Sequence, residues 1–241
     1  CNEILGNEYN NMFLEHFGKY IEEYNLENRI IFETENFCVL PSIGPLVEGH
    51  LLILTKEHYL SYAHIPQSKY RELKQVKYST SKLLQRVYHS PVFFEHGPMS
   101  EVLKGGTCCD HAHLHAVPVD IEINIKEELQ KFNFIPRDIK DLEELRDNKE
   151  RLVPYLFFED SQGEKIVCDA PMVETQFIRK LLAVKIGSKN VFWRYNLNIE
   201  LVVAALRKLR ATSEGWKEEG NNFPLLSGNT NFLYEQEMGM I

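Results

Sequence analysis

The stretch HAHLHAV, residues 111–117, carries a histidine at every second position. Only nine histidines are spread over the 241 residues, so this regular spacing needs an explanation. In a β-strand successive side chains point to opposite faces, so His111, His113 and His115 share one face and the small apolar residues between them share the other. A helix would scatter the three rings around its cylinder. The pattern therefore predicts a strand with an apolar core face and a histidine-lined cleft.

Apolar periodicity outside this stretch predicts the other elements of the fold. Helical stripes are expected over residues 9–24, 68–89, 125–132, 139–149, 174–186 and 198–211. Short apolar runs predict strands at RIIFET (29–34), FCVLP (37–41), HLLILT (50–55), VFFEHG (92–97), PYLFFED (154–160) and KIVCDA (165–170), the last two joined by a hairpin turn at SQGE. Because several strands follow one another without an intervening helix, we predict an antiparallel sheet with flanking helices in an α+β fold.

No linker or repeat divides the sequence, so we predict one domain over residues 1–241. A core over residues 1–120 would carry the histidines, and a C-terminal extension over residues 121–241 would pack on it. No apolar run is long enough to span a membrane. The beginning, CNEILGNEYNN, has no signal-peptide pattern, and its lack of Met suggests that residues precede Cys1.

Composition limits the classes of function. The five cysteines are an odd number, which argues against a disulfide framework and favours a reducing, cytoplasmic setting. A net charge of −8 argues against broad nucleic-acid binding, which needs a basic surface. A small anionic ligand stays compatible with this charge, provided that its binding site is locally positive despite the negative charge of the whole chain.

Three chemistries fit the alternating histidines. Neighbouring imidazoles, about 6.6 Å apart along a strand, can converge on one metal ion, although all three on one ion would be strained. A histidine can instead act as a nucleophile whose neighbours set its tautomer. The third interpretation is a polar strand whose rings merely satisfy hydrogen bonds, and three titratable rings beside a core make it the weakest of the three.

The residues before the histidines favour phosphorus chemistry. Lys104, Gly105, Gly106 and Thr107 precede the stretch, and glycine backbone can turn several N–H groups toward an anion. A neutral imidazole is well populated at pH 7, because its reference pKa is about 6.5. We therefore expect His113 to attack phosphorus beside a glycine-built anion seat.

With these motifs assembled, the sequence resembles the histidine-triad (HIT) superfamily, whose signature His-φ-His-φ-His-φ-φ, with φ hydrophobic, is matched by HAHLHAV. Upstream, FETENFCVLPSIGPLVEGHLLILTKEHY (32–59) resembles the first hairpin of the family, and VFFEHG resembles the strand that follows. The likeness covers about residues 1–120. Further on, a Gln-x-x-Arg stretch before an aromatic–Arg pair is similar to longer HIT-like proteins and would place Gln176, Arg179, Trp193 and Arg194 in that pattern.

The resemblance implies a role for each matching residue. His113 would attack the α-phosphorus of a nucleotide and become nucleotidylated, and His115 would help the leaving group depart. His50 would orient His113. The implied substrate-binding residues are Leu40, Ser42, His50, Leu52, His96, Gly106, Thr107, Gln176 and Arg179. At Ser42, His96 and Thr107 the family more often has Asn, Asn or Asp, and Gln respectively, which suggests a substrate other than the simplest dinucleotides.

The resemblance also implies a structural zinc site. Many bacterial relatives hold zinc with an N-terminal Cys-x-x-Cys pair, the His of Lys-x-His and the first triad histidine. Cys1, His58 and His111 match three of these four ligands, and the fourth would precede Cys1. An unliganded Cys1 is the alternative. If zinc is bound, His111 is structural.

We therefore predict a HIT-family nucleotide hydrolase or nucleotidyltransferase that works through a covalent nucleotidyl-histidine. Mg²⁺ would accompany a polyphosphate substrate, and a homodimer is expected from the family alone. Two alternatives stay open: a non-enzymatic nucleotide-binding protein, and a zinc metalloenzyme in which the histidines ligate the metal.

Overall fold

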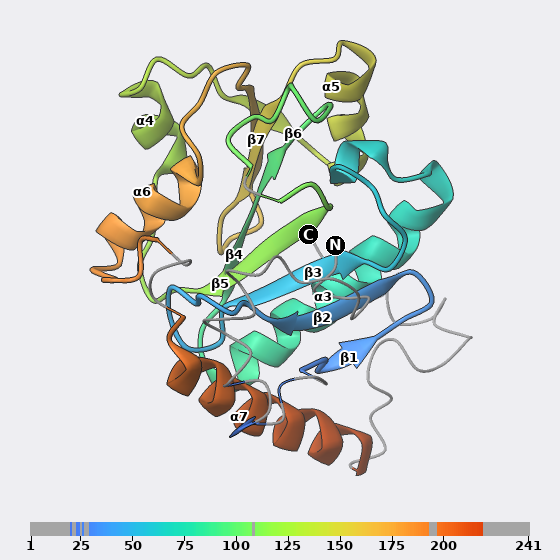
Figure 1. Cartoon of the computed structure of the whole chain (residues 1–241), viewed down its shortest axis with the longest axis vertical. Helices are drawn as coiled ribbons and strands as arrows, with labels where there is room; N and C mark the ends of the chain where they lie inside the picture. The colour runs from blue at the N-terminus through green and yellow to red at the C-terminus, as the bar shows by residue number, and fades with distance from the viewer. Residues whose placement is uncertain are drawn as a thin grey trace.

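The computed structural model describes residues 20, 23, 24, 26, 29–107, 109–192 and 197–218. These residues form an eight-stranded sheet in which every pair of neighbouring strands is antiparallel, with helices on both faces (Figure 1). The predicted α+β class and antiparallel sheet are confirmed.

The strands are numbered along the chain and interleave in the sheet. Their bounds are β1 Phe32–Glu33, β2 Phe37–Pro41, β3 Leu51–Thr55, β4 Pro91–Gly97, β5 His113–Pro118, β6 Arg137–Ile139, β7 Tyr155–Glu159 and β8 Lys165–Asp169. Their order across the sheet is β1-β2-β3-β5-β4-β7-β8-β6. The histidine-bearing β5 is therefore enclosed between β3 and β4, in the interior of the sheet.

The helices connect or follow these strands. Their bounds are α3 Tyr70–Val87, α4 Ile125–Gln130, α5 Arg146–Glu150, α6 Phe177–Lys185 and α7 Ile199–Glu218, with 3₁₀ turns at Tyr62–His64, Gln67–Lys69 and Leu142–Leu145. Among the described helices none is long and apolar enough to cross a membrane.

One face of the sheet forms the larger core. The apolar residues between the histidines, Ala112 and Leu114, are fully buried on this face with Phe93 and Phe157 from the neighbouring strands. Helix α3 covers the face and lies behind β2 and β3 in Figure 1. Each buried leucine or phenylalanine side chain in this core stabilises the fold by about 1.5–3 kcal/mol. This core therefore holds β5 with its histidines directed to the opposite face.

Helices α4 and α6 cover part of the opposite face. Val92, Phe94 and Val117 pack there against the apolar side of α6, including Ile178 and Leu182. In Figure 1 both helices lie beside the β4 and β7 end of the sheet. The histidines of β5 share this face, so α6 approaches them from the side of β4.

Strand β4 joins the two parts of the chain. It pairs with β5 on one edge and with β7 on the other. The C-terminal region thus continues the same sheet through β7, β8 and β6, whereas the sequence suggested an extension packed on a finished core. Helix α7 packs separately, against Ile43 and against α3.

Most predicted elements are found, and two differ. The SQGE hairpin and the long helix after residue 68 are confirmed as β7–β8 and α3. His111 is not in the strand, which begins at His113. The segment 139–149 is not one helix, because Ile139 ends β6 and a 3₁₀ turn precedes α5. The predicted helix over residues 9–24 lies mostly outside the described residues.

Candidate functional site

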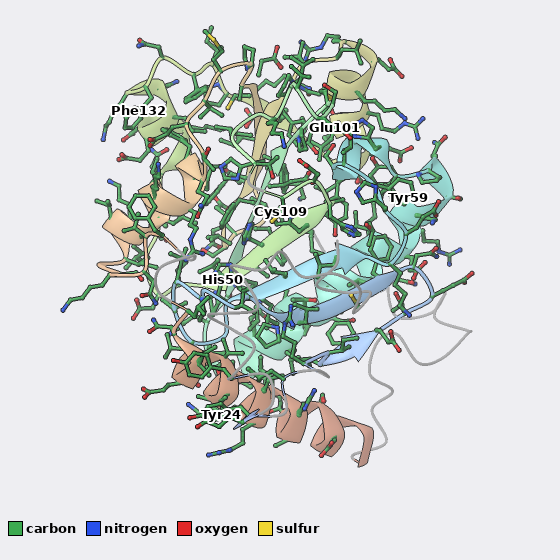
Figure 2. The ribbon with its side chains drawn as sticks, in the orientation of Figure 1. Tyr24, His50, Tyr59, Glu101, Cys109 and Phe132 are labelled. Atoms are coloured by element: carbon green, nitrogen blue, oxygen red, sulfur yellow. The ribbon has the colours of Figure 1, made fainter. Side chains whose placement is uncertain are left out.

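A pocket opens on the histidine face of the sheet, with about 520 Å³ of empty space that is open to solvent. Its lining comes from four parts of the chain: the loop after β2, the strands β3, β4 and β5, the glycine loop with Cys109, and the beginning of α6. The lining residues are Ser42, Ile43, Leu52, His96, Gly106, Thr107, Cys109, His113, His115, Gln176 and Arg179. Figure 2 labels Cys109 beside the beginning of β5 and His50 at the beginning of β3.

The charge around this pocket is opposite to that of the chain. The protein as a whole carries −8, yet the lining that the described residues form contains the Arg179 guanidinium, three imidazoles and no carboxylate. Helix α6 also begins at the pocket, and the N-terminus of a helix carries partial positive charge. A local field of this sign favours an anionic ligand.

The tautomer of His113 is set by a backbone carbonyl. Its Nδ1 lies 2.7 Å from the carbonyl oxygen of His111. A carbonyl only accepts hydrogen bonds, so Nδ1 carries the proton and the neutral ring has its lone pair on Nε2. The residue is 9% exposed and lines the pocket. His113 therefore presents a nucleophilic nitrogen.

The tautomer of His115 is set through His50. The backbone N–H of Leu46 donates to Nδ1 of His50 over 3.1 Å, so neutral His50 carries its proton on Nε2. That Nε2 lies 2.9 Å from Nδ1 of His115 and donates to it. Neutral His115 then has its own proton on Nε2. The two adjacent histidines of β5 are thus opposite tautomers, one with a lone pair on Nε2 and one with a hydrogen.

Burial keeps these supporting rings neutral. Desolvation lowers the pKa of His50 and of His115 well below the usual value, and the nearby charge of Arg179 acts in the same direction. The ring of His115 stacks on Phe94, with centroids 4.3 Å apart and planes 8° from parallel. Because the neutral His115 ring is held in position by this stacking, its Nε2 hydrogen points in a fixed direction.

The glycine loop is fastened to the C-terminal region. Gly106 adopts φ +77°, and a Cβ there would come within 2.8 Å of both the Glu174 carbonyl oxygen and a methyl of Val173. Its own carbonyl accepts a hydrogen bond from the backbone N–H of Gln176 over 2.9 Å. Only glycine fits this close approach with a left-handed backbone.

The hydroxyl of Thr107 is already engaged. It donates to the carbonyl oxygen of Cys109 over 2.9 Å. Its hydrogen is therefore donated within the loop. The side chain still lines the pocket and can accept a hydrogen bond.

Two buried residues link α6 to the rest of the pocket. The backbone N–H of Ile178 donates to Nε2 of His96 over 3.2 Å, and burial lowers the pKa of His96 to about 3. Arg179, which is 3% exposed, donates to the carbonyl oxygens of Gly44, Asn190 and Val191. Arg179 therefore bridges α6 to the loop after β2 and is no surface residue.

Most predicted site residues meet in this pocket. Ser42, Leu52, His96, Gly106, Thr107, His113, His115, Gln176 and Arg179 all line it. Leu40 does not line it and instead packs with Cys38, Leu52 and Leu54. His50 is fully buried, and its Nε2 bonds His115, whereas the sequence predicted that it would orient His113.

The predicted zinc ligands are only partly described. The rings of His58 and His111 lie 5.3 Å apart, while Cys1 falls outside the described residues, as do Trp193 and Arg194. Nε2 of His58 bonds the Asp110 carbonyl, and Nε2 of His111 bonds the Thr55 carbonyl over 2.6 Å. Neither Nε2 is available as a ligand in this arrangement. In the described part of the chain no three His, Cys, Asp or Glu side chains gather as a metal site.

Two lining residues were not assigned to the site from the sequence. Ile43 belongs to the turn-like segment after β2, where nothing in the sequence distinguishes one apolar residue from the next. Cys109 belongs to the vicinal cysteine pair before the histidines, and its side chain forms part of the pocket wall.

The family model described as "Protein similar to CwfJ C-terminal" matches residues 21–133, which is just under half of the chain and includes all of β1 to β5. A search of the curated proteins gave no match.

Among solved structures, similar proteins include three described as histidine triad or HIT-like. A hypothetical histidine triad nucleotide-binding protein from Sulfolobus tokodaii has 18% identity and a TM-score of 0.32, covering 55% of this chain and 90% of that one. A HIT-like protein involved in cell-cycle regulation from Bartonella henselae has 15% identity and a TM-score of 0.32, covering 57% and 95%. A zinc-bound histidine triad family protein from Mycobacterium smegmatis has 19% identity and a TM-score of 0.33, covering 56% and 94%.

Proposed function

We propose that this chain is a histidine-triad nucleotide hydrolase or nucleotidyltransferase that forms a covalent bond between His113 and the α-phosphorus of its substrate. The observation that carries the proposal is the opposite tautomers of His113 and His115, one ring offering a lone pair and its neighbour a hydrogen. A nucleophile beside a hydrogen-bond donor suits a substitution at phosphorus.

The first step breaks the bond to the leaving group. Nε2 of His113 bonds to phosphorus, and the bond from phosphorus to the leaving oxygen breaks with its electron pair going to that oxygen. The Nε2 hydrogen of His115 stabilises the charge that develops there or on the phosphoryl oxygens. A phosphate or pyrophosphate leaving group departs as an anion and needs no proton.

The second step frees the enzyme. Water attacks phosphorus, the nitrogen–phosphorus bond breaks with its electron pair returning to Nε2 of His113, and the proton of the water passes to solvent. A different acceptor in place of water would make the same chain a transferase. Mg²⁺ carried in with a polyphosphate would neutralise part of its charge.

The two flanks of the pocket suggest how the substrate lies. On the β3 side the wall contains the apolar Leu52 and Ile43 with the hydroxyl of Ser42, which suits a base and a ribose. On the β4 side it contains His96 and Gln176, which suit polar groups. Arg179 extends from α6 to Gly44 in the loop after β2 and so adds its positive charge between the two flanks. With phosphorus at His113, the nucleoside would lie toward β3 and the leaving group toward α6.

Intact-mass analysis tests the proposal. The protein is mixed briefly with a panel of nucleoside polyphosphates, dinucleotides and nucleoside phosphoramidates, quenched and weighed. We expect a mass gain equal to one nucleoside monophosphate with at least one substrate, and loss of that gain in His113→Ala. His89→Ala is the matched control, because His89 is exposed and outside this pocket.

The alternatives give different results. A binding protein without activity would retain nucleotide, show no adduct and bind equally well as His113→Asn. A zinc enzyme would lose turnover on chelation and form no adduct, whereas the proposed chemistry survives a chelator when the substrate carries no polyphosphate. Absence of an adduct and of turnover over the whole panel would refute the proposal.

A further inference from the structure

Gln176 stands at a position where folding gives no reason for glutamine. Its backbone has φ 63° and ψ 31°, a left-handed conformation that glycine or asparagine adopts more easily. It also precedes the first turn of α6, where Ser, Thr, Asp or Asn would cap the helix with a side-chain oxygen. The Gln176 side chain makes no such cap. Neither the backbone nor the cap explains this residue.

The side chain of Gln176 has an unsatisfied carbonyl at the pocket. Its Oε1 is buried and has no hydrogen-bond partner among the residues that the structure describes, and the residue lines the pocket with His113 and His115. A buried polar atom without a partner is costly and rare, and backbone strain of the kind seen at Gln176 clusters at functional sites. The strained backbone and the unpaired oxygen therefore indicate the same conclusion, a function in ligand binding.

The surroundings of Gln176 place it on one side of the phosphorus. Its backbone N–H holds Gly106, and two residues later α6 meets His96 on β4. Leu52 is on β3, at the opposite side of β5. If the nucleoside lies toward β3, as in the proposed function on which this inference rests, Gln176 faces the leaving group.

We propose that Gln176 is a specificity-determining residue whose side-chain carbonyl accepts a hydrogen bond from an N–H or O–H of the leaving group. The last torsion of a glutamine side chain is soft, so Oε1 turns toward such a group without movement of the helix. The pocket then prefers leaving groups that carry a donor next to phosphorus over those that offer only acceptors, such as pyrophosphate.

The test uses two substrates that differ in one atom. Adenosine 5′-phospho-4-nitroanilide has N–H between phosphorus and the ring, whereas adenosine 5′-(4-nitrophenyl phosphate) has oxygen there. The quantity measured is the ratio of kcat/KM for the anilide to that for the ester. Because the intrinsic reactivity of each substrate is common to all variants, a change in this ratio between variants reports the contact with residue 176.

Three variants separate the explanations. In Gln176→Met, which removes the acceptor, we expect the ratio to fall about fivefold to tenfold, the loss of one hydrogen bond. In Gln176→Glu, which retains an acceptor of the same shape and has no N–H donor, the ratio should stay within about twofold of wild type, although both rates fall. Gln85→Met, the same substitution at an exposed position of α3, should change neither rate.

The outcomes distinguish this inference from the function beneath it. A wild-type ratio in Gln176→Met, or an equal fall in Gln176→Glu and Gln176→Met, would overturn the acceptor role while nucleotidyl-His113 still forms. The loss of activity in Gln176→Met could instead depend on whether the substrate carries ribose or deoxyribose. That result would place the contact of Gln176 on the nucleoside and would also overturn the proposed contact with the leaving group. If wild type forms no adduct and turns over neither substrate, the proposed function falls first and this inference with it.

Discussion

The histidine half of the sheet, residues 29–120, and the covering half, residues 121–218, contribute differently to the pocket. The first supplies the nucleophilic nitrogen of His113 and the hydrogen of His115, each fixed by a contact within that half. The second supplies Gln176 and Arg179 and none of the β5 histidines. The atoms to which we assign the reaction are thus positioned by local contacts, and the enclosure of the pocket around them depends on contacts between the halves.

Three contacts between the halves, here called the joints, can be broken one at a time. The first is the hydrogen bond from Gln176 to Gly106, and the second is the bridge from Arg179 to the carbonyl of Gly44. The third lies on the far face of the sheet, where the Tyr155 hydroxyl donates to the buried carboxyl of Glu95. If the two halves contribute in this way, breaking a joint should affect the closed shape of the pocket and the stability of the fold more than the chemistry of His113.

The largest effect is expected for Gly106→Val. The new side chain collides with Glu174 and Val173 on a left-handed backbone, so we expect kcat/KM to fall about 100-fold or more and the free energy of unfolding to fall by roughly 3 kcal/mol. Gly163→Val is the control, because Gly163 has φ +92° and nothing within 4 Å of the added Cβ. Equal losses in the two variants, by activity assay and urea unfolding, would mean that backbone strain alone is responsible.

Arg179→Met should destabilise the protein by about 3 kcal/mol. The substitution leaves the carbonyls of Gly44, Asn190 and Val191 without the guanidinium that they accept from, in a buried place. Arg151→Met breaks an exposed ion pair with Asp169 and should cost less than about 1 kcal/mol. Comparable urea midpoints for the two variants would contradict the bridging role.

Glu95 should make stability depend on pH in a defined direction. Burial raises the pKa of this carboxyl from 4.5 to about 8, so between these values the folded state holds a proton that the unfolded state has lost. The free energy of unfolding contributed by Glu95 therefore decreases as pH rises from 4.5 to 8, by about 3 kcal/mol between pH 5 and 8.

The measurement is urea unfolding of wild type and Glu95→Gln at several pH values from 5 to 8. We expect the variant to gain stability relative to wild type as pH rises, because its amide has no proton to lose. Buried neutral histidines such as His96 titrate in the opposite direction, and their effect cancels in the difference between the two proteins. A pH-independent difference would show that Glu95 is charged in the folded state.

The smallest effect is expected within the histidine half, for His50→Ala. Without His50, Nδ1 of His115 loses its donor and the ring no longer has a fixed tautomer, so kcat should fall about tenfold. His50→Gln supplies an amide N–H and should recover part of the loss. The ¹⁵N chemical shifts of His115 provide an independent measurement, and unchanged shifts and kcat in His50→Ala would refute the relay.

The sequence predicts the strands and the reactive face well, because both follow from local periodicity. The alternation over Ala112 to His115 fixes which side chains face the core, because the apolar ones must be buried and the histidines then lie on the other face. The apolar runs of β2 and β7 coincide with the strands found. His111 departs from the expectation because alternation does not specify where strand pairing stops. Backbone pairing of β5 begins at His113.

The supporting contacts were harder to predict because they depend on register and long-range pairing. His50 bonds His115 because Leu52 pairs with His115 across β3 and β5, a register that the sequence alone does not fix. Gln176 and Arg179 were expected from family resemblance only. Their approach to the pocket requires β7 to pair with β4, across about 60 residues of chain.

The two ends of the sheet have a consequence for self-association. The terminal strands, β1 and β6, contain two and three residues, while every longer described strand has a partner on both edges. Within the described residues a second molecule would find little unpaired strand backbone to extend, and this disfavours edge-to-edge pairing of sheets. If a homodimer forms, as the resemblance implies, we expect contacts between side-chain surfaces and not a continuous sheet.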